Sequence, residues 1–259
     1  MKIEICANSF ASAVAAQDAR ADRIELCTEL AIGGLTPSHG LLKKVIEELS
    51  IPTHALIRPR SGDFTYSEDE LDVMLKDIKY CKEIGCTGIV SGVLTKNKAG
   101  EIIIDQNATA RLIKASTGME FTFHRAFDWV NDPVRAIDQL SDMGVARLLT
   151  SGQKPTAIEG IDLLKKVKSQ VNRFRGSDKI PLQIMPGGGI NAENAFQFKN
   201  AGFEAVHFSA TRKEQKLDAK PKVPFHSDLF FEEGIVATSD IEKIRAVKKA
   251  IQHPGSARA

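Results

Sequence analysis

The stretch RADRIELCTELAIGGLTPSHG, residues 20–40, carries the pattern on which the fold prediction rests. It begins with a short apolar strand that contains Glu25 and Cys27, and a Gly-Gly turn follows. Side chains alternate between the two faces of a strand. Glu25 and Cys27 are therefore predicted to share one face, while the apolar residues between them pack against covering helices.

The same unit, a short apolar strand followed by an amphipathic helix, recurs about eight times along the chain. The predicted strands are Ile3–Ala7, Arg23–Cys27, Thr53–Arg58, Gly88–Val93, Glu120–His124, Arg147–Thr150, Leu182–Met185 and Ala205–Phe208. Strands that alternate with helices indicate βαβ units and a parallel sheet. Eight units in 259 residues predict an α/β fold, a (β/α)8 TIM barrel, with residues 1–259 as a single domain and a flexible tail at about residues 252–259.

Helix start signals support this division of the chain. Three pairs have capping-box spacing, in which two side chains satisfy free backbone N–H groups: Ser67/Glu70, Thr156/Glu159 and Ser239/Glu242. In Asp132-Pro133, a capping acid precedes a proline at the first helical position.

Composition narrows the class of protein. The 35 basic and 33 acidic residues are closely mixed, which does not favour a nucleic-acid partner. Apolar runs are too short to cross a membrane, and residues 1–9 do not resemble a signal peptide. The four cysteines form no secreted disulfide pattern, so a reducing, cytoplasmic location is predicted.

Polar residues gather where the predicted strands end, which is the functional face of a barrel. Arg58 and Arg60 end the third strand, and His124 and Asp128 lie at the end of the fifth. An adjacent carboxylate orients a histidine ring and tunes its pKa, so Asp128 is expected to act on His124. An ion pair of Glu4 or Glu25 with Arg58 that only stabilises the barrel is the alternative.

The segment PGGGI after the seventh strand predicts an anion site. Gly187, Gly188 and Gly189 let the backbone approach a ligand closely, a helix start follows, and the eighth strand supplies Ser209. A tight turn without a ligand is the alternative. The chain has no GxSxG, HExxH, Walker or Rossmann pattern, and no interior lysine at a strand end for Schiff-base chemistry.

Seven blocks in order resemble the CutC family of copper homeostasis proteins. They are ADRIELC, GGLTPSHG, IRPRSGDFTYSEDEL, GIVSGVL, TFHRAFD, RLLTSG and MPGGGI. The resemblance implies a (β/α)8 barrel, a cytoplasmic role in copper handling with copper(I) bound through cysteines, and assembly as a homo-oligomer, for which a dimer is the expectation.

Two main hypotheses follow for the site. In the first, Cys6 and Cys27 on neighbouring strands bind copper(I), a soft ion that suits thiolates. In the second, the barrel is an enzyme of isomerase or lyase type that acts on a small phosphorylated or carboxylated metabolite. Its predicted residues are Glu25, His124 and Asp128 for catalysis, and Arg58, Arg60, the three glycines and Ser209 for binding. A non-catalytic ligand sensor would use the same pocket.

Overall fold

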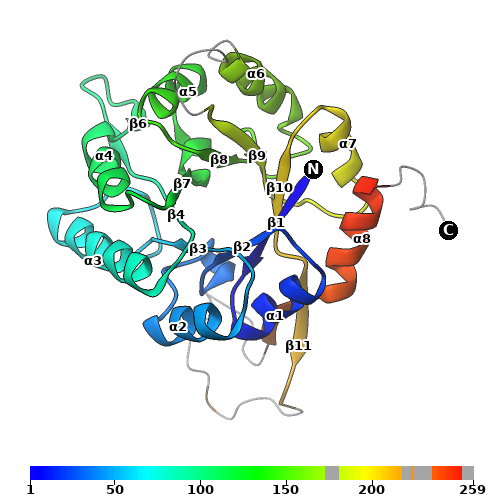
Figure 1. The fold of residues 1–259 in the computed structure, drawn as a ribbon. Helices are drawn as coiled ribbons and strands as arrows, with labels where there is room; N and C mark the ends of the chain where they lie inside the picture. The colour runs from blue at the N-terminus through cyan, green and yellow to red at the C-terminus, as the bar shows by residue number, and fades with distance from the viewer. Residues whose placement is uncertain (173–180, 218–222, 224–234, 253–259) are drawn as a thin grey trace.

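Eight short parallel strands form the inner wall of the protein (Figure 1). The structure is a computed structural model, and it describes residues 1–172, 181–217, 223 and 235–252. In spatial order the strands are β10 (Ala205–Phe208), β1 (Lys2–Ala7), β2 (Arg23–Leu26), β3 (Thr53–Leu56), β4 (Gly88–Ser91), β7 (Glu120–Phe123), β8 (Arg147–Thr150) and β9 (Gln183–Pro186). A parallel bridge between Gly187 and His207 joins the two edges, so the predicted barrel is confirmed as a nearly closed one.

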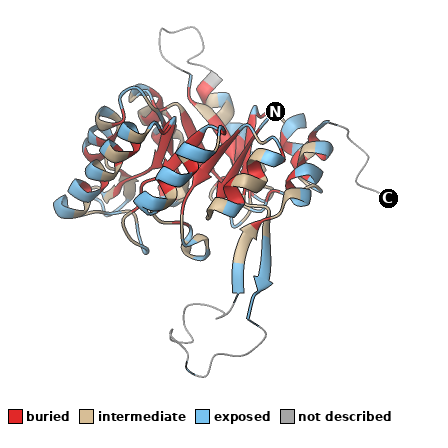
Figure 2. Cartoon of the chain, turned by 60° about the horizontal axis from the view of Figure 1, so that its bottom comes forward, coloured by how far each residue is buried: buried red, intermediate tan, exposed pale blue. Residues whose placement is uncertain are grey.

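Helices surround the strands and cover their outer faces, as Figures 1 and 2 show. They are α1 (Phe10–Asp18), α2 (His39–Glu48), α3 (Glu68–Ile84), α4 (Gln106–Ala115), α5 (Pro133–Asp142), α6 (Ile161–Asn172), α7 (Ala195–Asn200) and α8 (Ile241–Gln252). Ile24 and Leu26 of β2 are fully buried among the residues of this shell. Burial of such side chains, worth roughly 1.5–3 kcal/mol each, holds the helices on the barrel.

The helix start signals are mostly confirmed. Ser67 and Glu70 form the predicted capping box of α3, and Asp132 caps α5 ahead of its first-turn proline. Thr156 and Glu159 contact each other, but in the turn before α6. The Ser239/Glu242 prediction is wrong, because the next residue, Asp240, accepts the free N–H groups at the start of α8.

In the described parts of the chain, two antiparallel hairpins lie outside the barrel, and their strands were not predicted. β5 (Leu94–Lys96) pairs with β6 (Ile102–Ile104), and β11 (Thr211–Gln215) pairs with β12 (Ile235–Ser239). The second hairpin extends away from the barrel in Figure 2. The predicted tail falls mostly outside the described residues, since α8 ends at Gln252.

Strand register decides which side chains meet inside the barrel. Glu4 of β1 is the register partner of both Arg23 on β2 and His207 on β10, and Cys6 is the partner of Glu25. Because side chains alternate, all five point to the interior.

Within the described residues, none of the helices combines the length and apolar character needed to span a bilayer.

Candidate functional site: a buried polar cavity at the strand ends

A cavity of about 300 Å³ opens where the parallel strands end. That volume lies at the lower end of the range for small-molecule pockets. Its lining combines apolar walls with acidic, basic and glycine residues from seven of the barrel strands or the loops after them: Cys6, Glu25, Leu30, Gly33, Leu56, Arg58, Phe64, His124, Arg125, Leu149, Gly188, Gly189, Ile190, His207, Phe208 and Ser209.

An acidic side chain at the base of this site connects two cationic ones. One carboxylate oxygen of Glu4 accepts a hydrogen bond from Arg23, and the other lies 2.8 Å from Nδ1 of His207. Glu4 is only 1% exposed. Burial alone would raise the pKa of Glu4, but the His207 hydrogen bond and the Arg23 charge outweigh it and hold this pKa below its ordinary value. Glu4 is therefore an anion inside the barrel.

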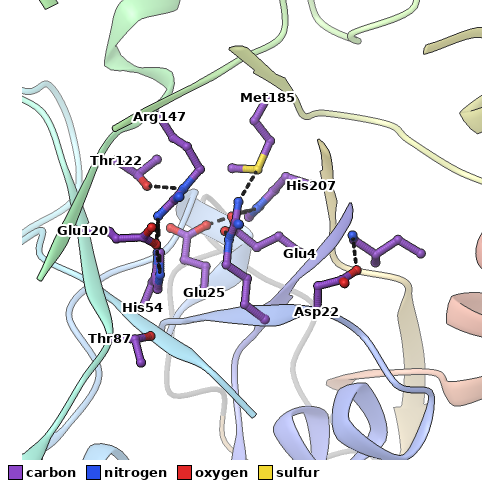
Figure 3. A network of polar contacts seen from close by, with 12 residues as sticks. Glu4, Asp22, Glu25, His54, Thr87, Glu120, Thr122, Arg147, Met185 and His207 are labelled. Carbon is purple, nitrogen blue, oxygen red and sulfur yellow. Dashed lines mark hydrogen bonds and ion pairs between the residues drawn. The ribbon is translucent and has the colours of Figure 1, made fainter. Parts of the chain in front are cut away.

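A second polar cluster fills the barrel interior on the side of the strand starts (Figure 3). Arg147 donates to Glu120 at 2.5 Å and to Thr122 at 3.2 Å, and His54 lies 3.3 Å from Glu120. Arg23 contacts the sulfur of Met185 at 3.2 Å. These groups pack the barrel beneath the cavity.

Glu25 and His207 form the acid–base pair of the cavity. Nε2 of His207 lies 3.3 Å from the Oε2 atom of Glu25, and both residues line the cavity. Burial raises the pKa of Glu25 to about 7, against the opposing effect of His207. Burial disfavours a charged His207, yet Glu25, Cys6 and Glu4 together raise its pKa well above the ordinary value. The pair can hold and move a proton near neutral pH.

The two barrel cysteines are neighbours, but only one of them reaches the cavity. The sulfurs of Cys6 and Cys27 are 3.6 Å apart, Cys6 lines the cavity, and Cys27 is fully buried beside it. The hydrogen bond to Cys27 and burial raise the pKa of Cys6 well above its ordinary value, which keeps it a thiol. Ligand atoms of Cys6, Glu25 and His207 lie within 4.8 Å of one another, a group that could hold a metal ion.

Arg58 and Arg60, which were both predicted to bind the substrate, lie in different places. Arg58 donates to the backbone carbonyls of Ile32, Gly34 and Gly62, so most of its guanidinium holds loops together. Arg60 pairs on the surface with Glu70 at 2.5 Å and with Asp63 at 3.1 Å, and it does not line the cavity.

His124 lines the cavity, but Asp128 does not orient its ring. Nδ1 of His124 accepts the N–H of Ala126 at 3.2 Å, whereas Asp128 pairs with Arg125 and accepts hydrogen bonds from the loop after β8. Burial and the nearby Arg58 charge lower the pKa of His124 to about 3, so its ring is neutral. Nε2 of His124 then carries the proton, and it is buried without a partner in the described structure, as is Nε of Arg58.

The predicted glycine loop follows β9 and contributes two of its three glycines to the cavity. Gly188 and Gly189 line it, and both have positive φ values of 107° and 71° that favour glycine. Gly187 instead donates to Thr150 within the barrel wall. Ser209, after β10, lines the cavity as well.

Comparison with known proteins then decides the family. A sequence model of the CutC family matches residues 1–212. The chain belongs to the CutC family. It is 42% identical to a CutC family protein of Pasteurella multocida (strain Pm70), over 97% of this chain and 99% of that one.

Solved structures agree with this assignment. A CutC crystal structure from Streptococcus agalactiae, whose name connects it provisionally with copper homeostasis, matches with a TM-score of 0.72 and 33% identity, over 81% of this chain and 98% of that one. N-(5'-phosphoribosyl)anthranilate isomerase from Pyrococcus furiosus matches with a TM-score of 0.53 and 13% identity, over 97% and 98% of the two chains, a likeness in fold alone.

Sequence reasoning on this CutC chain missed three residues of the site. Glu4 was considered only as an ion-pair partner of Arg58, whereas it pairs with Arg23 and His207. His207 was assigned no role, and Arg125 was passed over in favour of its neighbour His124. The signal for the first two was present: Glu4 and Cys6 are two residues apart on one strand, as are His207 and Ser209, so each pair shares a face.

Proposed function

We propose that this chain is an acid–base enzyme that acts on a small anionic metabolite in the cavity at the strand ends. The observation that carries the proposal is the Glu25–His207 pair, whose facing atoms are 3.3 Å apart on the cavity wall. A carboxyl group whose pKa is about 7 and a protonated imidazole are suited to take up and deliver a proton at neutral pH.

The chemistry that fits this pair is an isomerisation or a lyase reaction next to a carbonyl group. Glu25, in its carboxylate form, would take a proton from a carbon adjacent to the carbonyl, and the electron pair of the broken C–H bond would move onto the carbonyl oxygen. His207 would give its proton to that oxygen. Glu25 then returns its proton to the former carbonyl carbon while the hydroxyl on the adjacent carbon becomes the new carbonyl and gives its proton back to His207, which completes an isomerisation with no oxidant or reductant.

His124 supports this chemistry as a neutral hydrogen-bond donor. Its Nε2–H is buried and without a partner among the described residues, so a substrate oxygen that reaches it would satisfy a donor that is otherwise costly to bury. A neutral imidazole donates to a developing oxyanion without having to give up its proton.

A screen for bound metabolites followed by isotope exchange tests the proposal. Phosphorylated sugars, sugar acids and 2-oxo acids are screened by thermal shift, and each stabilising compound is incubated with the enzyme in D₂O. We expect deuterium to enter a C–H position, and we expect Glu25→Gln to bind the compound without exchange. Glu47→Gln, on the exposed face of α2, is the control that keeps exchange. Binding without exchange in the wild-type protein would contradict an enzyme and favour a ligand sensor.

A second candidate function, copper(I) binding, is favoured by the Cys6, Glu25 and His207 group together with the nearby Cys27 sulfur. Thiolates and imidazole suit copper(I), whereas a carboxylate does not. Binding would have to displace the protons that the surroundings hold on Cys6 and His207, so affinity is expected to rise steeply with pH.

Anaerobic copper(I) titration against a competing chelator tests this second function. The measurement is made at several pH values on the wild type and on the Cys6→Ser/Cys27→Ser double variant. Tight binding that releases protons and disappears in the double variant supports it, and binding that is unchanged in the variant contradicts it. Size-exclusion chromatography with light scattering on the same samples tests the expected homodimer.

A further inference from the structure

Arg125, which sequence reasoning did not assign, reaches from η2 (Arg125–Trp129) to the glycine loop after β9. Its Nε donates to Asp128 at 2.8 Å and its second terminal nitrogen donates to the Ser151 hydroxyl at 2.7 Å. A Cβ added to Gly188 would lie 3.3 Å from the other terminal nitrogen, NH1. Among the described residues NH1 has no hydrogen-bond partner, so a positively charged donor lies free beside the glycine loop.

The loop itself presents unused backbone donors. The N–H groups of Gly189 and Ile190 have no acceptor within the described part of the chain, and both residues line the cavity. The carbonyl groups of this loop are occupied: Gly188 accepts from Ala157, and Gly189 accepts from the Asn194 side chain. The loop is therefore braced on its carbonyl side while its donors stay available.

Ser209 adds a hydroxyl from the loop after β10. Its oxygen accepts a hydrogen bond from the Thr211 hydroxyl at 2.8 Å, which leaves the proton of Ser209 free to be donated. Ser209 lines the same cavity as Arg125 and the glycine loop.

We propose that these groups form a subsite for the phosphate group of a small phosphate monoester, with Arg125 as its charged ligand. The inference rests on the proposed function, because it names the substrate class of the same cavity. The subsite offers four donor groups from three separate segments: the Arg125 terminal nitrogen NH1, the backbone N–H groups of Gly189 and Ile190, and the Ser209 hydroxyl. A phosphate monoester has three terminal oxygens in a tetrahedral arrangement and carries close to two negative charges, so it can accept from all three segments. A carboxylate has two oxygens in one plane and leaves part of this set unsatisfied.

Asp128 is the positioning residue of this subsite. Its carboxylate is held by the Ser151 and Gln153 backbone N–H groups and by the Thr150 and Ser151 hydroxyls, and it pairs with Nε of Arg125. This arrangement fixes the plane of the guanidinium, so that NH1 lies beside the glycine loop.

Binding of simple probes tests the subsite. Inorganic phosphate, 2-phosphoglycolate and malonate are titrated by calorimetry, and the Arg125 side-chain Nε–Hε signal is followed by ¹⁵N NMR. We expect 2-phosphoglycolate to bind at least tenfold more tightly than malonate and to shift the Arg125 signal. Because Arg125 would make a charge-assisted hydrogen bond to the anion, we expect Arg125→Gln to weaken the affinity for 2-phosphoglycolate about 10- to 100-fold.

Arg111→Gln is the matched control, because Arg111 is also about two-fifths exposed and also paired with a carboxylate at 2.8 Å, on α4 and outside the cavity. It should bind the probes as the wild type does. Arg125→Lys should recover part of the lost affinity. Asp128→Asn should weaken binding less than Arg125→Gln does, and should move the Arg125 Nε–Hε signal in the ligand-free protein, which a merely structural change elsewhere would not do.

The outcomes separate this inference from the proposed function. Malonate binding with no response to either phosphate probe, or phosphate binding that Arg125→Gln leaves unchanged, overturns the subsite and leaves the acid–base proposal standing. Phosphate binding through Arg125 combined with no deuterium exchange in any metabolite supports the subsite and overturns the enzyme. If Arg125→Gln fails to fold, the shift of the wild-type Arg125 signal on adding 2-phosphoglycolate decides, and its absence overturns the inference.

Discussion

Nε2 of His207 lies 3.3 Å from the Glu25 carboxylate, and Nδ1 of the same ring lies 2.8 Å from Glu4. One imidazole therefore bridges two acids that differ in their surroundings. Glu4 also has the Arg23 guanidinium and stays ionised, whereas Glu25 has no such partner in the described structure and holds its proton up to neutral pH. Two carboxyl groups on neighbouring strands are thus suited to different tasks.

Removal of the Glu4 charge should destabilise the protein and lower the pKa of His207. Glu4→Gln breaks a buried ion pair from one side, a change that costs about 3–5 kcal/mol of unfolding free energy. It should also lower the pKa of His207, since Glu4 is one of the groups that raise it. Urea denaturation and His207 ring ¹⁵N NMR measure the two effects, and an unchanged His207 titration would contradict this account.

In the wild type, low pH should remove the same charge by protonating Glu4. The folded pKa of Glu4 lies below its unfolded value of 4.5, so its contribution to stability is complete above that pH and is lost as the pH falls further. We expect Glu4→Gln to lose less stability than the wild type when urea denaturation is repeated at pH 4 and below. An equal loss in both proteins would assign the acid sensitivity to other carboxylates.

Glu25 should affect stability in the opposite direction. Its folded pKa of about 7 lies above the unfolded value of 4.5, so the folded state holds this proton more tightly, and stability falls as the pH rises between these values. The slope is at most about 1.4 kcal/mol per pH unit for one group. Glu25→Gln should remove it, and infrared difference spectra should lose a carboxyl band that titrates near pH 7. A band that titrates near pH 4 would contradict the prediction.

Gly92 should prove essential for the position of His124. A Cβ at residue 92 would lie 2.7 Å from Nδ1 of His124 and 3.0 Å from the Phe123 ring, so Gly92→Ala forces the imidazole to move at a cost of about 1–3 kcal/mol. Gly40→Ala is the matched control, because that glycine lies inside α2 with nothing within 4 Å of the added atom. The control should gain about 0.5–1 kcal/mol. Thermal unfolding and the His124 NMR signals distinguish the two variants.

Arg58 should matter chiefly for loop order. Arg58→Lys replaces a fork that reaches three backbone carbonyls with a single ammonium group, and loss of the buried bond to the Gly34 carbonyl should cost about 1–3 kcal/mol. Hydrogen exchange should quicken in residues 30–36 and 59–65. Arg60→Lys, which changes a surface ion pair, should alter stability by about 1 kcal/mol or less. Equal hydrogen exchange of these loops in the two variants would contradict this role of Arg58.

The barrel could be predicted because its evidence is local. Each strand is a short apolar run and several helices start at a visible signal, so the eight units can be counted without any knowledge of contacts between them. The same alternation correctly placed Glu25 and Cys6 inside. The two hairpins were missed because β11, TRKEQ, is polar and mostly exposed, and because β5 and β6 are only three residues long each.

The partners within the site could not be predicted, because they depend on loop conformations. Arg58 meets three carbonyls only because the loops around it turn through the left-handed Gly33, Gly34 and Gly62. Asp128 follows His124 by four residues, but the 3-10 turn between them directs the carboxylate to the loop after β8. Distance along the sequence could not reveal either outcome.

The polar cluster around Arg147 and Glu120 lies in the barrel beneath the cavity, on the side of the strand starts. A molecule that binds in the cavity is therefore expected to enter and leave at the strand ends, past the loops and the Phe64 ring that line it. The dissociation rate of a bound ligand should then depend on the loops at the strand ends. Substitutions in the polar cluster around Arg147 and Glu120 should change the stability of the barrel, whereas substitutions in those loops should change how long a ligand remains bound.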